Sequence, residues 1–417
     1  MSKLNVELYG ALLGALVQND RGFEFEADLG VFTKYQLSST IMSISVPLNL
    51  RYTASQKRRG SNFFAELLPE GRNYDWLMQS LPYGERTSYN LLRKYGKDIA
   101  GALSIYDPND RAASVKPEAG LVDEKMIRYL FEHMPQAALA NSPLSGKTSL
   151  GGVQGKIVLA KIGATWNRVH NGYPSTHILK PAVQEYPTMI YDEAFCMQLA
   201  HKAGLTAHPV WIESFDGADA LVIERYDRDK NAGGTRIHQE DFNQALGIGG
   251  DEKYQEYGGK ASSKRVAQTL MRFGSGEDVK KLASQLIFAA AIGNLDMHAK
   301  NISVLHPPDE SVMLAPVYDQ VPLRHQNTDG RMALATGGEY IHANISLENI
   351  VSELVSWKCD GFPDEAAALA FIKNCLASFR DALKDSEPEG KAYPGLKTEI
   401  SSFISNLLSG KSIGGAS

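Results

Sequence analysis

The 417-residue chain has few cysteines, little net charge and no long apolar run. Its three cysteines, Cys196, Cys359 and Cys375, lie far apart and match no metal-ligand spacing, which is typical of a protein in a reducing cytosol. A formal net charge of only −5 argues against a protein that coats nucleic acid by itself. The longest apolar run, LIFAAAI, is too short to cross a bilayer, and the N-terminus MSKLNVELYG lacks the apolar segment of a signal peptide. These absences predict a cytoplasmic protein without a membrane partner.

The first third of the chain reads as a β-rich region followed by helices. KLNVELYG, GALVQ, FEFEA and MSISVPL alternate or carry β-rich runs, which predicts short strands within residues 3–50. NFFAELLPEG and YDWLMQSL favour helix, and GALSIYDP favours a closing strand. The polar stretch PNDRAASVKPEAG at 108–120 then indicates a linker.

From residue 146 the order of elements is that of a two-lobed nucleotide-dependent phosphotransferase. A glycine-rich loop is followed by three predicted strands, a helix, two more strands and a mostly helical region. We therefore predict an α+β fold, in which a two-lobed protein-kinase-like core carries an N-terminal β-rich subdomain and a mostly helical C-terminal lobe. The predicted parts are an N-terminal subdomain (1–110), a linker and connecting helix (111–145), an N-lobe with the glycine-rich loop (146–230), and a helical C-lobe with the catalytic loop (231–417).

The glycine-rich loop SGKTSLGGVQGK is a candidate phosphate-binding loop. It is not a Walker A motif, because that motif requires a glycine where Asn141 stands. Small residues let backbone N–H groups approach phosphate oxygens closely, although a plain flexible turn is the alternative. The predicted ATP-binding residues of this loop are Gly151, Gly152, Val153, Gln154, Gly155 and Lys156.

Lys180 is a candidate for the phosphate-binding lysine, since it lies in the short apolar strand HILKP. Lysine is seldom buried without an anion, and kinases use a strand lysine to reach the nucleotide phosphates. Glu193, in the following helix, is a candidate partner. The alternative is a lysine that protects an edge strand, which Pro181 also fits.

The apolar strand LVIE leads into the charged segment RYDR and is a candidate hinge. In a two-lobed kinase such a strand offers backbone groups to adenine. Tyr226 could then pack on the base and Asp227 could bind a ribose hydroxyl. A solvated strand end with an Arg–Asp pair is the alternative.

GNLDMHAKN, at 293–301, carries the clearest chemistry. Asp296 and Asn301 have the D-x-x-x-x-N spacing of a kinase catalytic loop, in which the Asp accepts the substrate hydroxyl proton and the Asn holds Mg²⁺. Lys300 is expected to neutralise the transferred phosphoryl group, and His298 to brace the loop or contact nucleotide. Asp319 follows a predicted hairpin, 302–305 and 312–314, where a kinase places its second metal ligand.

Several motifs in one order resemble those of the HipA family, the serine/threonine kinase toxins of type II toxin–antitoxin pairs. The resemblance runs from residue 63 to about residue 380 and implies a HipA N-terminal subdomain before the kinase core. The motifs are FFAELLPEG, SLGGVQGK, THILKP, DEAFCMQLA, IERYDR, HQEDFNQALG, GNLDMHAKNISV and LAPVYD.

This resemblance implies roles for individual residues. Asp296 would be the catalytic aspartate, Asn301 and Asp319 would bind Mg²⁺, and Lys180 would bind the ATP phosphates. The autophosphorylated serine of S-x-x-G-x-Q-x-K falls on Ser149, whose phosphate would expel the loop and shut off ATP binding. The implied ATP-binding residues outside the loop are Lys180, Glu224, Tyr226, Asp227, His298, Lys300, Asn301 and Tyr318.

The resemblance also implies partners. A HipB-like helix-turn-helix antitoxin would bind operator DNA, and the protein substrate would resemble an aminoacyl-tRNA synthetase whose phosphorylation halts translation and leads to growth arrest and persistence. Two alternatives stay open: a small-molecule or lipid kinase on the same scaffold, and a non-catalytic nucleotide-binding transcriptional co-repressor. The co-repressor reading predicts that Asp296→Asn keeps its biological effect.

Overall fold

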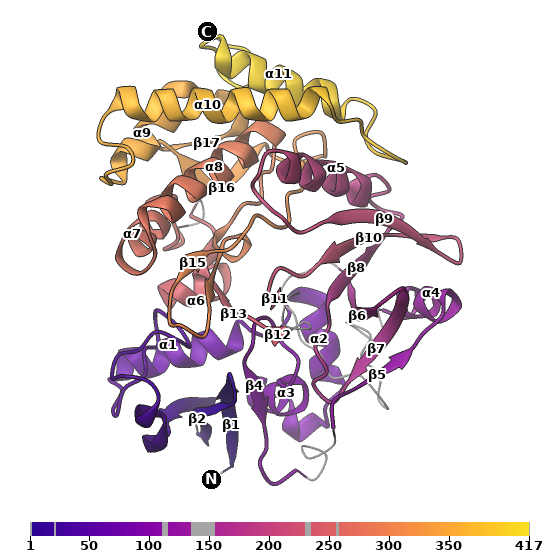
Figure 1. Cartoon of the computed structure of the whole chain (residues 1–417), viewed down its shortest axis with the longest axis vertical. Helices are drawn as coiled ribbons and strands as arrows, with labels where there is room; N and C mark the ends of the chain where they lie inside the picture. The colour runs from indigo at the N-terminus through magenta and orange to yellow at the C-terminus, as the bar shows by residue number, and fades with distance from the viewer. Residues whose placement is uncertain are drawn as a thin grey trace.

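The computed structural model describes residues 2–20, 22–110, 116–134, 155–229, 235–255 and 258–416. Figure 1 shows an N-terminal β-rich part at the bottom, a separate sheet on the right and a helical lobe at the top. This is the α+β architecture predicted from the sequence, with a two-lobed kinase-like core. Within the described ranges, no helix combines the length and apolar character needed to cross a membrane.

The N-terminal domain is an antiparallel sheet of order β3-β2-β1-β4 packed on helices. Alternate residues of β1 are buried, as the period of two requires when one face of a sheet covers a core. The strands predicted at the start and end of this region are confirmed. The elements are β1 (Lys3–Leu8), β2 (Ala11–Asn19), β3 (Gly22–Ala27), α1 (Ala54–Ala65), α2 (Gly71–Gln79), α3 (Ser88–Tyr95) and β4 (Ser104–Tyr106).

The strand predicted at MSISVPL is wrong, because residues 42–48 form no ladder. Their polar groups bind the kinase core instead. The Ser43 hydroxyl donates to Glu240 (2.7 Å), and the Ser45 hydroxyl donates to the carbonyl of Gln244 (2.6 Å). The alternation of serine and apolar residues therefore reflects a docked segment and not a pleated strand.

The second sheet is antiparallel with the order β5-β7-β6-β8-β10-β9. The strand of Lys180, β8, lies between β6 and β10, so the edge-strand interpretation is wrong. The predicted linker also ends too late, since its last residues begin β5. The elements are β5 (Glu118–Leu121), α4 (Glu124–Glu132), β6 (Ile157–Ile162), β7 (Thr165–His170), β8 (His177–Pro181), α5 (Met189–Lys202), β9 (Val210–Phe215) and β10 (Ala218–Glu224).

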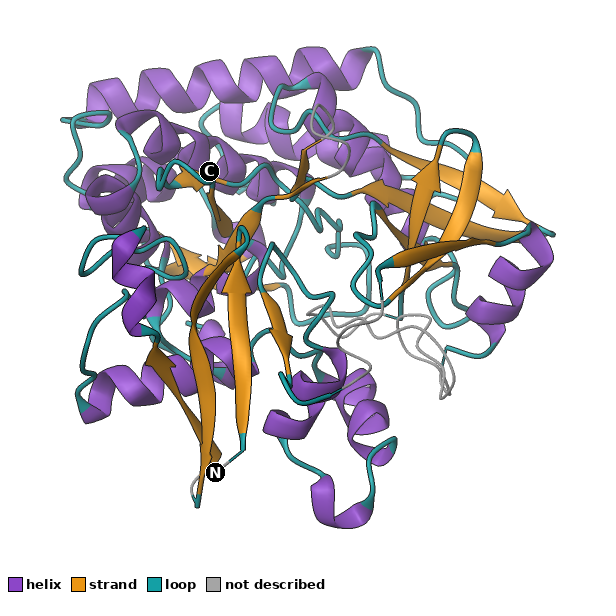
Figure 2. Cartoon of the chain, turned by 60° about the horizontal axis from the view of Figure 1, so that its bottom comes forward, coloured by secondary structure: helices purple, strands orange, loops and turns teal. Residues whose placement is uncertain are grey.

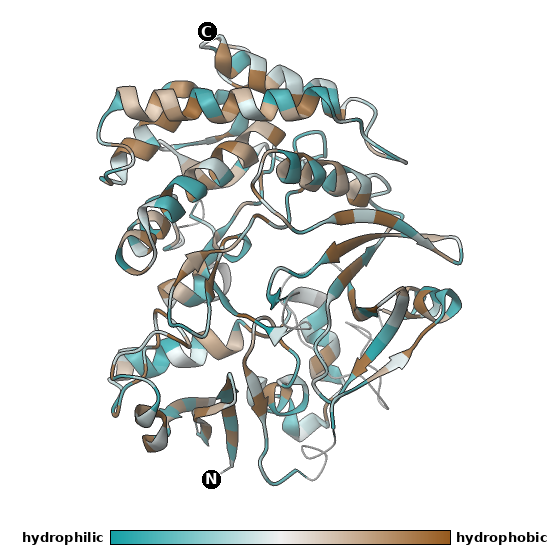
Figure 3. Ribbon diagram, viewed as in Figure 1, coloured by the Kyte–Doolittle hydropathy of each residue, from teal (hydrophilic) through white to brown (hydrophobic). Residues whose placement is uncertain are grey.

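The C-terminal lobe is mainly helical around the long buried helix α8. Figure 3 shows apolar and polar residues mixed along α10, the long helix near the top, and its buried residues recur every three or four positions, as its sequence spacing predicts. The side chain of Asp364 caps α10 by accepting from the backbone N–H of Ala367 (2.8 Å). The helices are α6 (Phe242–Leu246), α7 (Ser263–Phe273), α8 (Gly276–Ile292), α9 (Leu347–Ser356), α10 (Glu365–Lys384) and α11 (Leu396–Leu408).

Short strands complete the lobe, and the predicted hairpin before Asp319 is confirmed by the pairing of β14 with β15. These strands bring the segments around the catalytic loop together. They are β11 (Arg228–Asp229), β12 (Thr235–Arg236), β13 (His238–Asp241), β14 (Ser303–His306), β15 (Met313–Leu314), β16 (Arg331–Thr336) and β17 (Glu339–Ile341).

Buried His342 makes the stability of this lobe pH-dependent. Its Nε2 bonds to the carbonyl of Ala290 (2.8 Å), and burial lowers the pKa of His342 to about 4. Because the unfolded chain binds this proton more tightly, the contribution present above pH 6.5 is lost as the pH falls toward 4. Between pH 7 and pH 4 we expect wild type to lose about 3 kcal/mol more than His342→Gln in urea denaturation. Equal losses in the two proteins would contradict this assignment.

Candidate active site

A cavity of about 400 Å³ lies where the N-terminal domain, the six-stranded sheet and the helical lobe meet. Figure 2 shows loops gathered between that sheet and the helices. Of the described residues predicted for the site, Gly155 alone does not line the cavity. Ser149, Gly151, Gly152, Val153 and Gln154 lie outside the described residues. The predicted residues that line the cavity are Lys156, Lys180, Glu224, Tyr226, Asp227, Asp296, His298, Lys300, Asn301, Tyr318 and Asp319.

Lys180 bridges two carboxylates that also line this cavity. Its Nζ lies 2.8 Å from Glu193 Oε1 and 2.6 Å from Asp319 Oδ1. Burial alone would lower the pKa of Lys180, but the two carboxylates outweigh burial and raise it. Burial and the positive charge of Lys180 together lower the pKa of Lys156 to about 8. The pairing of Lys180 with Glu193, the candidate partner named from the sequence, is confirmed, and it resembles the pairing of a strand lysine with a helix glutamate in kinases.

The C-terminal segment fixes the helix that carries Glu193. The Asp192 carboxylate accepts the backbone N–H of Tyr393 (2.7 Å) and lies 3.2 Å from His325 Nε2. The rings of His325 and Tyr393 stack, with centroids 4.4 Å apart. Sequence reasoning missed these residues because Asp192 and Tyr393 are 201 positions apart and share no motif.

The end of α8 positions the predicted catalytic loop. The helix stops at Gly293, which has the left-handed φ of 73° that glycine tolerates best. The Asn301 side-chain amide then donates to the carbonyl of Asp296 (2.8 Å), while the N–H of Asp296 donates to Asn294 Oδ1 (3.0 Å). These bonds bring the two motif residues together and leave the Asp296 carboxylate half exposed, at 49%.

The charge of Asp296 is sensitive to its surroundings. Partial desolvation in the cavity wall and the neighbouring carboxylate of Asp319 raise the pKa of Asp296 to about 6, and the charge of Lys253 offsets part of that rise. A carboxylate with a pKa near neutrality is suited to accept a proton. This matches the role predicted for it.

Asp319 has a left-handed backbone, with φ of 54°, which is uncommon for a residue other than glycine. The flanking Tyr318 holds this turn, because its hydroxyl donates to the carbonyl of Lys300 (2.7 Å). The ring of Tyr318 also lies 5.4 Å from that of Tyr226. A strained residue with a cavity-lining carboxylate is typical of a functional position.

Asn301 and Asp319 fit a magnesium site. Both line the cavity, and amide and carboxylate oxygens are the ligands that this ion prefers. In the part of the chain that the structure describes, no three His, Cys, Asp or Glu side chains form a metal cage. Mg²⁺ is commonly held by one or two side chains together with water and phosphate oxygens, and Asn301 and Asp319 would be those side chains here.

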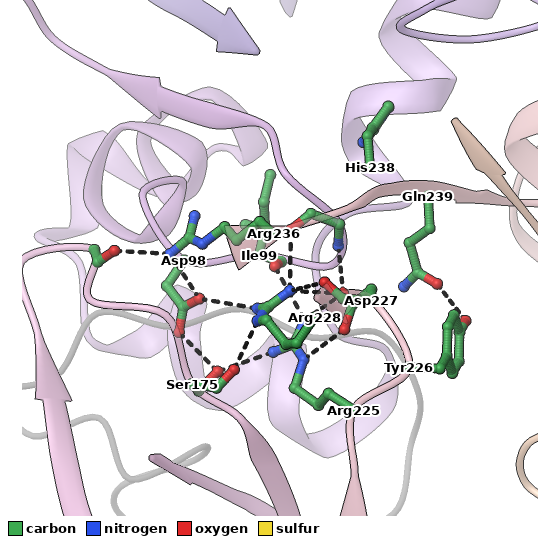
Figure 4. A network of polar contacts seen from close by, with 12 residues as sticks. Asp98, Ile99, Ser175, Arg225, Tyr226, Asp227, Arg228, Arg236, His238 and Gln239 are labelled. Atoms are coloured by element: carbon green, nitrogen blue, oxygen red, sulfur yellow. Dashed lines mark hydrogen bonds and ion pairs between the residues drawn. The ribbon is translucent and has the colours of Figure 1, made fainter. Parts of the chain in front are cut away.

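The predicted hinge needs one correction. Figure 4 shows the Asp227 carboxylate inside a buried network, where it pairs with Arg225 (2.7 Å) and accepts the N–H of Gly101 (2.8 Å). Arg228 lies 3.1 Å from the same carboxylate. These partners occupy the group predicted to bind ribose. The alternative prediction, an Arg–Asp pair at a solvated strand end, is confirmed for the ion pair and wrong for its exposure, because the pair is buried.

The remaining hinge residues face the cavity. The hydroxyl of Tyr226 donates to the side-chain oxygen of Gln239, and the ring of Tyr226 packs against that of Tyr318. The carboxylate of Glu224 lies 3.4 Å from His208 Nδ1. Burial raises the pKa of Tyr226 well above its ordinary value.

The predicted role of Lys300 also needs correction. Its ammonium group bonds to Glu66 and lies 3.1 Å from Glu70 Oε1. Two carboxylates of the N-terminal domain therefore hold the charge that was expected to face the phosphoryl group. Sequence reasoning missed both glutamates as site residues, although they belong to the motif FFAELLPEG.

His298 is neutral and packs edge to face on Tyr254, with ring centroids 5.2 Å apart. Burial, aided by the charge of Lys253, lowers the pKa of His298 to about 4. Of its two predicted roles, the packing supports that of bracing the loop.

Comparisons with known proteins give the same picture. The HipA N-terminal domain family matches residues 4–106, and the HipA-like C-terminal domain family matches residues 148–383. The putative kinase Y4mE of Sinorhizobium fredii is 32% identical over 345 residues, covering 80% of each chain. The serine/threonine-protein kinase toxin HipA of Shewanella oneidensis is 26% identical over 369 residues, covering 79% of this chain and 78% of that one.

The fold also has a solved counterpart. Shewanella oneidensis HipA, in a complex with HipB and operator DNA, superposes with a TM-score of 0.76 at 21% sequence identity. The match covers 97% of this chain and 96% of that one. With two family matches in the expected order, this chain belongs to the HipA family of kinase toxins.

Proposed function

We propose that this chain is an ATP- and Mg²⁺-dependent serine/threonine protein kinase that acts as the toxin of a HipBA-type toxin–antitoxin module. The observation that carries the proposal is the bridge from Lys180 to Glu193 and Asp319 in the cavity that Asp296 also lines. A kinase needs a strand lysine paired with a helix glutamate and a nearby aspartate that binds Mg²⁺, and these three residues fit those positions.

Each residue has a distinct task in this proposal. Asp296 accepts the proton of the substrate hydroxyl, and Lys180 contacts the ATP phosphates. Asn301 and Asp319 hold Mg²⁺, which neutralises charge on the phosphates when it is bound. Tyr226 packs on the adenine ring. Phosphoryl transfer depends mainly on such positioning and charge neutralisation, so no covalent intermediate with the protein is needed.

Regulation by Ser149 is part of the proposal. Ser149 opens the S-x-x-G-x-Q-x-K pattern of the glycine-rich loop, to which Gly151, Gly152, Val153, Gln154, Gly155 and Lys156 belong. A phosphate there adds nearly two negative charges to the loop that is expected to bind the nucleotide phosphates. Autophosphorylation would therefore inhibit the kinase.

The partners follow from the relatives. The Shewanella HipA structure holds HipB and operator DNA, and we propose a HipB-like helix-turn-helix antitoxin for this chain. Operator binding and co-repression would belong to the complex, which fits a net charge of −5 on the toxin. We further propose a cytoplasmic aminoacyl-tRNA synthetase as the protein substrate, whose phosphorylation halts translation.

Growth arrest tests this function. Induction of the wild-type chain in a bacterial host should stop growth, and co-expression of its antitoxin should restore it. Asp296→Asn should grow normally at equal protein level. Arrest by Asp296→Asn would favour the non-catalytic co-repressor, and wild-type protein that phosphorylates a metabolite but no protein would favour the small-molecule kinase.

A further inference from the structure

Two acidic residues of the N-terminal domain reach the active site without a role in the kinase scheme above. We propose that Glu66 and Glu70 are positioning residues of the phosphotransferase site, which hold the ammonium groups of Lys300 and Lys253 near Asp296 but away from its carboxylate. This inference rests on the proposed kinase function. It makes the N-terminal domain a working part of the catalytic centre.

The two glutamates sit on a corner that is anchored in the N-terminal core. Glu66 is the C-cap of α1, and Glu70 is the N-cap of α2. Between them, Leu67 and Leu68 are each only 2% exposed. Both leucines belong to the apolar core of the N-terminal domain, and both glutamates line the cavity.

Glu70 bridges two lysines from different segments of the kinase core. Its Oε2 lies 2.8 Å from Lys253 Nζ, and its Oε1 lies 3.1 Å from Lys300 Nζ. Glu66 also bonds to Lys300, and Asp241 Oδ2 lies 4.0 Å from Lys300 Nζ. Both lysine side chains are nearly buried, at 8% and 6% exposed, so these pairs are little screened by solvent.

The carboxylate of Asp296 could compete with the glutamates for these lysines. Lys300 directly precedes Asn301 in the same loop, and the charge of Lys253 lowers the pKa of Asp296. Among the described residues neither lysine has an ion pair with Asp296. A lysine side chain is long and flexible, so an ammonium group released from Glu70 would be drawn to that half-exposed carboxylate. It would then occupy the oxygen that must accept the hydroxyl proton.

The test compares Glu70→Gln with wild type and with Glu24→Gln, a control in the same domain whose carboxylate forms a surface pair with Lys57. The initial rate of phosphate transfer from ATP to the full chain is measured in the presence of Mg²⁺ over a range of ATP concentrations. Glu70→Gln should lower the maximal rate about tenfold or more, with the half-saturating ATP concentration changed less than about twofold. Glu24→Gln should match wild type.

A suppressor separates positioning from a general structural role. Adding Lys253→Met to Glu70→Gln removes the released ammonium group and should bring the maximal rate to within about threefold of wild type. A purely structural loss would be deepened by the second substitution. If Glu70→Gln does not fold, Glu66→Gln is measured alone and together with Lys300→Met, and the same loss and recovery of the maximal rate are expected.

The outcomes distinguish this inference from the function on which it rests. An active wild type with a fully active Glu70→Gln overturns the positioning role alone, as does a rate loss that Lys253→Met fails to relieve. A wild type that transfers no phosphate overturns the proposed kinase function, and the positioning role with it.

Discussion

Replacing Lys180 with methionine is expected to lower the free energy of unfolding by about 3–5 kcal/mol at pH 7 and to abolish ATP binding. Methionine has a similar length but no charge, so Glu193 and Asp319 would face each other without the cation that joins them. Glu193 is fully buried, and an unpaired carboxylate there is costly. The loss of ATP binding follows because the same cation is expected to hold the phosphates.

Urea denaturation and calorimetric titration with ATP and Mg²⁺ measure the two effects. Lys57→Met, which removes an exposed pair with Glu24, is the matched control and should change stability by no more than about 1 kcal/mol. The deficit of Lys180→Met should shrink as the pH falls toward 5, since burial already raises the pKa of Glu193 and a protonated Glu193 needs no cation. Equal deficits in the two variants would contradict a central role for the Lys180 bridge.

Replacing Asp296 with asparagine should lower the rate of phosphate transfer by about 10²–10⁴-fold while leaving the fold and ATP binding intact. Asparagine keeps the shape of the side chain but cannot take the hydroxyl proton. The carboxylate is half exposed, so its loss leaves no buried charge unpaired. Lys180→Met should fail at binding, whereas Asp296→Asn should fail only at transfer.

Phosphate incorporation and ATP titration of the same protein preparation measure this difference. Asp309→Asn, an exposed aspartate in the loop between β14 and β15, is the control and should transfer phosphate at the wild-type rate. Asp296→Asn that binds ATP and still transfers phosphate at more than about a tenth of the wild-type rate would rule out Asp296 as the base.

Local patterns predicted much of the fold because each one reports on its own segment. Alternation fixed the face of strands such as β1, and the spacing of apolar residues fixed the buried face of α10. The spacing of Asp296 and Asn301 placed the catalytic loop at the end of α8, where the side chain of one bonds to the backbone of the other.

The sequence could not predict contacts between distant segments. Lys300 and Glu66 are 234 residues apart, and each is an ordinary charged residue in its own segment. The motif around Glu66 and Glu70 was legible as a family signature but not as part of the active site. Asp227 was assigned to ribose for the same reason, because Gly101 and the arginines that occupy its carboxylate come together only in the folded chain.

Transfer of a phosphoryl group from ATP in this cavity is tested by the intact mass of the wild-type protein after incubation with ATP and Mg²⁺. We expect a gain of one phosphate, mapped to Ser149, which is absent without Mg²⁺ and absent in Asp296→Asn. A wild-type protein that gains no phosphate, and that in its unphosphorylated form binds no ATP, would contradict the kinase assignment.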